Sequence, residues 1–200
     1  MQAIANKIVS RIYGNGRGWC FTPKEFADLG STESVRIALF RLVKKKTIRR
    51  LAKGLYDYPL EHEQLGLLSP SPDAVARALA YRDAIRIQPT GAYATNLLGL
   101  SEQVPAKIVY LTDGRARRVK LGGREIRLKH TTPRNMTTAG RISGTVIQAL
   151  SFIGKDRLTT VHVETLRRKL SADDKKCLSN DRIHAPSWMY KWLRQISEEK

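Results

Sequence analysis

The chain has 200 residues, 42% of them hydrophobic, so it is long enough to bury a core and is not a disordered tail. Its 36 lysines and arginines against 18 acidic residues give a formal net charge of +18, which argues for a polyanionic partner such as nucleic acid. No run approaches the ~18 apolar residues of a membrane-spanning helix. The amino terminus lacks a signal-peptide pattern, and the two cysteines are far apart, so we expect a cytoplasmic protein without a disulfide framework.

Positive charge is concentrated in two blocks. Residues 1–60 carry 12 basic and 4 acidic side chains, net +8, whereas residues 61–104 carry 3 and 5, net −2. Residues 105–141 carry 10 and 2, again net +8. Two basic blocks separated by a near-neutral stretch predict two contact surfaces rather than one diffuse field.

The first block predicts three helices and a hairpin. Isoleucines at helical spacing indicate a helix over residues 3–13. Thr22 and Glu25 flank Pro23 in a capping-box pattern, which predicts the start of a second, short helix. A third helix is predicted over residues 31–45, because its apolar residues recur every three or four positions.

Two strand-like runs follow, at residues 47–51 and 54–58, joined by a basic turn. A short helix, a glycine turn, a longer basic helix and a hairpin are the order of a winged helix-turn-helix, whose second helix enters the DNA major groove. Arg36 suits guanine, and Ser31 and Lys44 suit phosphate. The alternative is that these charges form the solvated face of an amphipathic helix. The predicted DNA-binding residues are Ser31, Thr32, Ser34, Arg36, Arg41, Lys44, Arg49, Arg50 and Lys53.

The remaining chain predicts a linker at residues 61–70 and a second domain over 71–200. Helices are expected near 74–81, 90–98, 142–153, 161–170, 173–178 and 187–196, and strands at 85–88, 107–112, 117–121 and 124–130. Asp113-Gly114 and Gly122-Gly123 supply turn chemistry between the last three strands. The predicted fold class is α+β: a winged helix-turn-helix over 1–60, then a mixed α/β domain with antiparallel hairpins and terminal helices.

The second basic block lies on these hairpin strands. Many of its cations alternate with apolar residues, which predicts one apolar face and one positive face. Such a face fits further DNA contact, an RNA surface or a dock for an acidic partner, and composition does not choose among them. The residues of this predicted second basic surface are Arg115, Arg117, Arg118, Lys120, Arg124, Arg127 and Lys129.

An enzyme is the alternative class. Asp113 and Glu125 echo the Asp…Glu-x-Lys spacing of metal-dependent nucleases, but Arg127 stands where that pattern has lysine, and Asp113 lies in a turn dipeptide. The four histidines are scattered without metal-ligand spacing. We therefore expect a non-enzymatic binding protein with no metal and no cofactor.

Several blocks in order resemble the AbiEi-type antitoxins of type IV toxin–antitoxin systems. The resemblance covers roughly residues 19–155, and its blocks are 41–59 (RLVKKKTIRRLAKGLYDYP), 71–78 (SPDAVARA), 88–92 (QPTGA), 96–100 (NLLGL), 104–107 (VPAK) and 110–114 (YLTDG).

This resemblance implies a winged amino-terminal domain that represses its own operon at inverted repeats, as a dimer or cooperatively. It implies that Arg36, Arg41, Arg49 and Arg50 bind operator DNA. It also implies a carboxy-terminal domain that counteracts a nucleotidyltransferase-like toxin, with or without direct contact. The basic stretch 105–141 would then serve the antitoxin activity or further DNA contact.

Overall fold

The computed structural model describes residues 2–121 and 123–198. The chain divides into two compact units: the first runs to Ile85 and includes Val119–Gly123, and the second comprises Arg86–Arg118 and the chain from Arg124 onward. The mixture of α-helices and small sheets confirms the predicted α+β class. Among the described residues, no helix is both long enough and apolar enough to cross a membrane.

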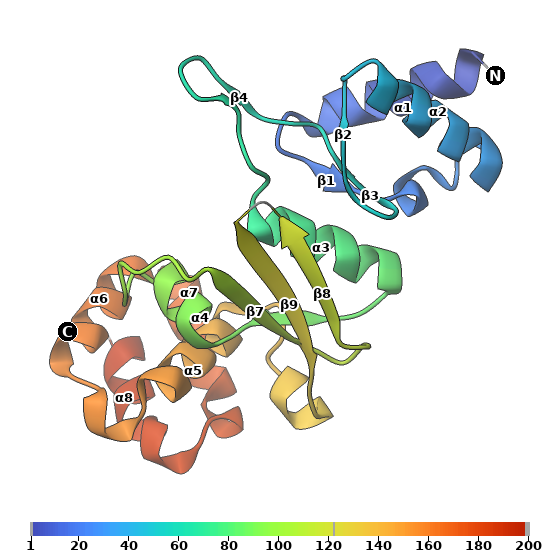
Figure 1. The fold of residues 1–200 in the computed structure, drawn as a ribbon. Helices are drawn as coiled ribbons and strands as arrows, with labels where there is room; N and C mark the ends of the chain where they lie inside the picture. The colour runs from blue at the N-terminus through green and yellow to red at the C-terminus, as the bar shows by residue number, and fades with distance from the viewer. Residues whose placement is uncertain (1, 122, 199–200) are drawn as a thin grey trace. The chain divides into compact units, whose positions relative to one another are not determined.

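The first unit starts with the element order of a winged helix-turn-helix (Figure 1). In chain order its elements are α1 (Gln2–Asn15), β1 (Cys20–Phe21), the 3₁₀ turn η1 (Pro23–Phe26), α2 (Thr32–Lys44), β2 (Arg49–Ala52) and β3 (Leu55–Asp57). Strand β3 lies between β1 and β2, antiparallel to both. The predicted first and third helices and the hairpin are therefore present within a few residues of their expected bounds.

One apolar core holds these elements together. The buried stripe of α2 consists of Val35, Ala38, Leu39 and Leu42. It packs with apolar side chains from the other elements of the unit: Ile8, Ile12, Phe21, Phe26, Ile48 and Tyr56. Since this stripe fixes the rotation of α2, the opposite face of the helix is turned to solvent.

The predicted second helix is a single 3₁₀ turn. Pro23 occupies its first position as expected, but Thr22 makes no side-chain capping bond, and its buried Oγ1 has no hydrogen-bond partner among the described residues. The predicted capping box is wrong because the backbone N–H of Glu25 donates to the Thr22 carbonyl at 3.1 Å, which closes the 3₁₀ turn. That N–H is therefore not directed at the Thr22 hydroxyl.

The predicted linker contains a small exposed hairpin of β4 (Glu61–His62) and β5 (Gly66–Leu67). The next helix, α3 (Pro72–Asp83), was expected in the second domain but groups with the first unit. Lys24 explains part of this grouping, since its Nζ donates to the carbonyls of Tyr81 and Arg82 at 3.0 and 3.3 Å. The last carbonyls of a helix lack partners within the helix, so η1 caps α3.

The second unit is built on strands of a sheet with the order β6-β7-β9-β8. These strands are β6 (Ile87–Pro89), β7 (Lys107–Thr112), β8 (Arg117–Leu121) and β9 (Arg124–His130). Strand β7 is antiparallel to β6 and parallel to β9. A hairpin at Asp113-Gly114 is therefore wrong, because β9 lies between β7 and β8. An Asp-Gly pair specifies a local reversal but not which strand becomes the neighbour.

In the described part of the chain, five helices complete the second unit, and α4 (Gly91–Leu97) packs against β7 (Figure 1). The five are α4, α5 (Ile142–Ile153), α6 (Thr160–Lys169), α7 (Ala172–Asp181) and α8 (Tyr190–Ser197), with 3₁₀ turns η2 (Pro133–Met136), η3 (Lys155–Arg157), η4 (Arg182–His184) and η5 (Ser187–Met189). Their shared core includes Leu98, Leu150, Leu166, Leu178 and Leu193. The helices predicted in this region are confirmed.

A buried carboxylate ties α5 to α7. Asp181 is almost fully buried and accepts hydrogen bonds from Arg141 and Ser143 at the start of α5. The Sγ of Cys177 lies 3.7 Å from both the Ser143 hydroxyl and the Asp181 carboxylate. These contacts satisfy the polar atoms that the helix packing buries, which indicates a structural role for the cluster.

Candidate nucleic-acid interface

The amino-terminal end of α2 uses its polar side chains for capping. Ser31 is the N-cap, and its Oγ accepts a hydrogen bond from the backbone N–H of Ser34 at 3.2 Å. The two serine hydroxyls also contact each other at 3.0 Å. Ser31 and Thr32 are exposed and Ser34 is half-buried. Of the predicted contacts at this end, Ser31 and Ser34 therefore already stabilise the helix.

The outward face of α2, together with its C-cap residue Lys45, carries four cations and two apolar side chains. Its members are Glu33, Arg36, Ile37, Phe40, Arg41, Lys44 and Lys45 in chain order, with Glu33 as the acidic member. Arg36 donates to Glu33 through Nε and a terminal nitrogen, at 2.9 and 2.7 Å, and this pairing lowers the pKa of Glu33. Both side chains are largely exposed, so a base or phosphate can compete for Arg36 at small cost.

Phe40 occupies the centre of this face, and the sequence prediction missed it. Its side chain is 57% exposed, and the Nζ of Lys44 lies 5.1 Å from the ring centroid. Arg36, Phe40 and Lys44 are spaced by four residues, so they follow one line along the helix. That spacing, opposite the buried stripe, was the available signal, but Phe40 has no charge or hydrogen-bonding group from which a DNA contact is predicted.

An open groove runs between α2 and the hairpin of the first unit. It has a volume of about 630 Å³. Its lining combines apolar side chains with three cations: Pro23, Arg36, Ile37, Phe40, Val43, Arg50, Lys53, Gly54 and Tyr56. A second hollow of about 650 Å³ between α1 and α2 includes the predicted residues Arg41 and Lys44. Helix α2 is thus bordered on both sides by accessible, basic surface.

Arg49 and Arg50 are adjacent in sequence but have different roles. Arg49 donates to the Asp57 carboxylate at 3.1 and 2.6 Å and to the Leu68 carbonyl at 2.7 Å. Asp57 has 1% of its side chain exposed, so Arg49 neutralises a buried charge. Although Arg49 is predicted to bind DNA, its half-buried guanidinium is engaged by Asp57 and the Leu68 carbonyl, and these bonds stabilise the hairpin.

The same buried carboxylate influences a cysteine. Cys20 of β1 and Arg49 of β2 are the two register partners of Asp57 on β3. Burial, and then the negative charge of Asp57, raise the pKa of the Cys20 thiol to about 12. Cys20 is therefore an inert, protonated core residue.

Arg50 and Lys53 are exposed on the hairpin, as a wing requires. Both line the groove beside α2, together with Arg36. Arg41 and Lys44 are also exposed on α2. The structure therefore groups Arg36, Arg50 and Lys53 around one groove of the first unit.

The predicted second basic surface is less uniform than its sequence. Strand alternation puts Arg118 on one face of β8 and Arg117 with buried Val119 on the other. On β9, Arg127 and Lys129 share one face, whereas Arg124 alternates with them. Arg115 precedes β8 and is exposed, and Lys120 is exposed in the part of β8 that groups with the first unit. The seven cations therefore do not share one face.

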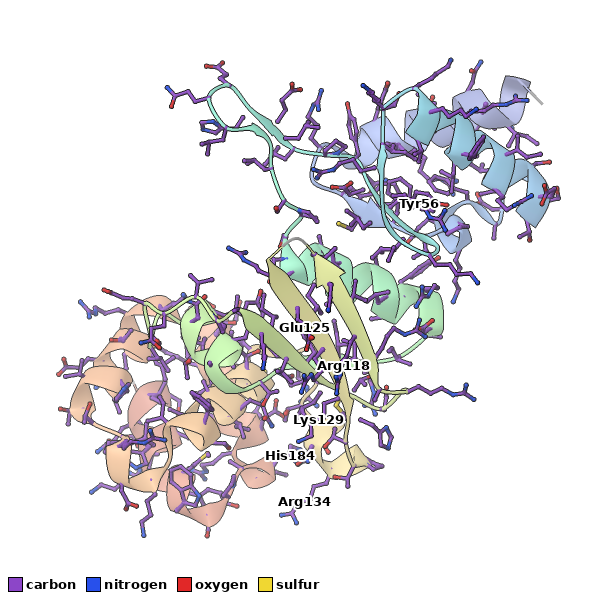
Figure 2. All side chains as sticks on the ribbon, viewed as in Figure 1. Tyr56, Arg118, Glu125, Lys129, Arg134 and His184 are labelled. Atoms are coloured by element: carbon purple, nitrogen blue, oxygen red, sulfur yellow. The ribbon has the colours of Figure 1, made fainter. Side chains whose placement is uncertain are left out.

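Glu125 interrupts the positive charge of this region. Arg127 donates to its Oε1 at 3.2 and 2.9 Å, and Lys107 is its register partner on β7. The hydrogen bond from Arg127, with the charges of Arg118 and Lys107, lowers the pKa of Glu125. Figure 2 shows Glu125, Arg118 and Lys129 along these strands.

The two carboxylates of the nuclease alternative lie apart. Glu125 is opposite Lys107 at the start of the parallel β7–β9 pair, whereas Asp113 follows Thr112 at its end. Six residues of strand separate these positions by about 20 Å. Asp113 accepts from the backbone N–H and Nε of Arg86, at 2.9 and 2.8 Å. Burial alone would raise the pKa of Asp113, but these bonds together lower it. Each carboxylate is thus ionised and paired with arginine.

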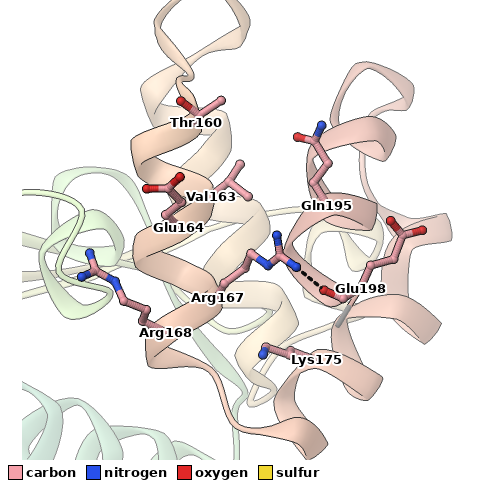
Figure 3. Close-up of a pocket in the computed structure, with 8 residues that line it drawn as sticks. All are labelled: Thr160, Val163, Glu164, Arg167, Arg168, Lys175, Gln195 and Glu198. Carbon is pink, nitrogen blue, oxygen red and sulfur yellow. Dashed lines mark hydrogen bonds between the residues drawn. The ribbon is translucent and has the colours of Figure 1, made fainter. Parts of the chain in front are cut away.

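A third hollow, of about 940 Å³, lies in the helical part of the second unit (Figure 3). Cations and carboxylates both line it, among them Arg167, Arg168, Lys175, Glu164 and Glu198. Arg167 points toward Glu198 and donates to its backbone carbonyl at 2.7 Å. Because the charges are mixed, this hollow is a weaker polyanion site than the groove beside α2. Within the described residues, no group of three histidine, cysteine or acidic side chains could hold a metal ion.

Comparison with known proteins gives a family. A search of curated proteins finds no match for this sequence. A family model described as "Family of unknown function (DUF6088)" matches residues 7–178, which include α2, the hairpin and most of the second unit. The chain therefore belongs to the DUF6088 family.

Proposed function

We propose that this protein is a sequence-specific DNA-binding repressor whose first unit holds double-stranded DNA. In this proposal α2 lies in the major groove and the β2–β3 hairpin contacts the phosphate backbone. One observation supports this proposal. The apolar stripe of α2 is buried in the core, so Arg36 faces outward and lines the same groove as Arg50 and Lys53 of the hairpin. Arg36 would recognise a base, and the two hairpin cations would position the protein.

The resemblance to AbiEi-type antitoxins supplies the biological context of the proposal. We infer that the chain represses its own operon at inverted repeats in the cytoplasm, as a dimer or cooperatively. The second unit would counteract a nucleotidyltransferase-like toxin encoded next door. The separate core of that unit is compatible with a separate activity.

The test of DNA binding compares two duplexes, the protein's own upstream DNA and a scrambled sequence of the same composition. Fluorescence anisotropy with the full chain should show selective binding of the upstream duplex. If about six phosphates are neutralised, log affinity should fall with log salt with a slope near −5. Equal binding of both duplexes would contradict sequence-specific recognition.

Paired variants locate the phosphate contacts. Arg50→Ala combined with Lys53→Ala should reduce the magnitude of the salt slope by about two, because each cation releases about one counterion. The matched control, Lys176→Ala with Lys191→Ala, removes two exposed lysines from α7 and α8. An equal change in the control would indicate a nonspecific effect of net charge.

Antitoxin activity is tested separately by co-expression with the neighbouring toxin. The full chain should restore growth, and the Arg50/Lys53 double variant should still do so while failing to repress a reporter fused to the upstream DNA. Loss of both functions in that variant would contradict the assignment of the two activities to different units.

A further inference from the structure

The outward face of α2 has an apolar centre that phosphate binding does not require. Phe40 is 57% exposed and Ile37, one turn earlier, is half-buried. Both line the groove beside the hairpin together with Val43 and Tyr56. Exposing an aromatic ring to water is unfavourable, so an occupant that covers it gains free energy.

Positive charge surrounds this apolar centre. Arg36, Arg50 and Lys53 line the same groove, and Lys44 lies over the Phe40 ring at 5.1 Å. The Lys44 ammonium above the ring also restricts the movement of the Phe40 side chain, so this side chain loses less conformational entropy when a ligand binds. The groove therefore fits a ligand with an apolar group at its centre and negative charge at its edges.

A second copy of this chain does not fit that description. In a two-fold interface the same patch meets itself, which would bring Arg36, Arg50 and Lys53 close to their own copies. Like charges facing each other across an interface are unfavourable. The DNA major groove fits better, because phosphates border it and the 5-methyl group of thymine is the apolar feature of its base edges.

We propose that Phe40, with Ile37, recognises thymine through its 5-methyl group, which makes Phe40 a specificity-determining residue. This inference rests on the proposed DNA binding by α2. Arg36 precedes Phe40 by four residues, about 6 Å along the helix. At 3.4 Å per base pair, the recognised thymine lies within about two base pairs of the guanine that Arg36 contacts.

A methyl scan of the upstream duplex tests this inference. Each thymine is replaced singly by uracil, which removes the 5-methyl group and keeps every hydrogen-bonding atom. Burial of one methyl group is equivalent to about fourfold in affinity, or about 0.8 kcal/mol. The wild-type full chain should bind about fourfold more weakly at one or two positions. Phe40→Ala should bind thymine and uracil duplexes equally, and Phe40→Leu should recover part of the preference.

Further controls separate thymine recognition by Phe40 from the proposed DNA binding on which it rests. Phe152→Ala removes another exposed phenylalanine, in the second unit, and should keep the thymine preference. Thermal unfolding should show that Phe40→Ala remains folded, because the ring is largely exposed. Upstream-selective binding that ignores uracil replacement would overturn the inference and leave the proposed function intact. Absence of selective binding would overturn both the inference and the proposed function. If the wild-type chain is a dimer that Phe40→Ala dissociates, the ring serves self-association instead of thymine recognition.

Discussion

The face of α2 and the face of β9 come from two sequence blocks of equal net charge, yet they place their carboxylates differently. In the first unit, Asp57 is buried beneath the hairpin and takes Arg49 inward with it. In the second, Glu125 stays on the strand face and is paired with Arg127 beside Arg118.

This difference shows why net charge does not define an interface. A carboxylate below the surface neutralises one cation and leaves its neighbours free to meet a ligand. A carboxylate on the surface weakens the field of every cation around it. In the first arrangement Asp57 lies away from Arg50 and Lys53, and Glu33 is the acidic member of the α2 face. The second arrangement places Glu125 directly among Arg118, Arg127 and Lys107.

The largest expected effect separates two cations of β2, the half-buried Arg49 that pairs with buried Asp57 and the exposed Arg50. Arg49→Met should lower the free energy of unfolding by about 3 kcal/mol, because it leaves the Asp57 carboxylate buried without a partner. Arg50→Met, the adjacent exposed control, should change it by less than about 0.5 kcal/mol. Urea denaturation measures both, and equal losses would contradict the distinction between these two arginines.

The next effect concerns specificity on α2. Arg36→Ala should weaken binding to the upstream duplex by about 2 kcal/mol and relax the preference at one base pair. Arg118→Ala, which removes a cation from the other basic region, should have a much smaller effect. Competition binding with single-base-pair variants measures the preference. An equal loss on random DNA would remove base recognition from the role of Arg36.

The smallest effect compares the exposed Glu33–Arg36 pair with the half-buried Glu125–Arg127 pair. Glu33→Gln should strengthen DNA binding slightly, by about twofold at most, because it releases Arg36 and removes a negative charge from the α2 face. Glu125→Gln makes the same change on β9 and should leave DNA binding nearly unchanged. Affinities measured at low salt maximise the contrast. A larger gain from Glu125→Gln would mean that the second region also contacts DNA.

Local patterns predicted the elements of this fold well. The period of apolar residues located α1, α2 and α5, and turn dipeptides marked the ends of the strands in the second unit. The pattern could not predict that β9 would lie between β7 and β8, because pairing depends on contacts between distant segments. The same limit applies to α3, which the sequence places in the second domain but the structure groups with the first unit. Its hydrogen bond to Lys24 joins residues 57 positions apart, which a local pattern does not reveal.

The candidate site was predicted in part. The helix and hairpin that carry Arg36, Arg50 and Lys53 follow from sequence spacing. The inward role of Arg49 does not, because it depends on the register that places Asp57 opposite it. Phe40 is not among the predicted contacts because its ring has no charge or hydrogen-bonding group, although its spacing from Arg36 and Lys44 places it on the outward face.

The bond between Arg49 and Asp57 has an evolutionary consequence. Positions 49 and 57 are constrained together by a buried pair, so within the family a change at one should be accompanied by a change at the other. Positions 36, 40 and 50 face outward and carry no such constraint. Under the proposed function, a lineage could therefore alter the DNA that it recognises while the hairpin keeps the same Arg49–Asp57 support.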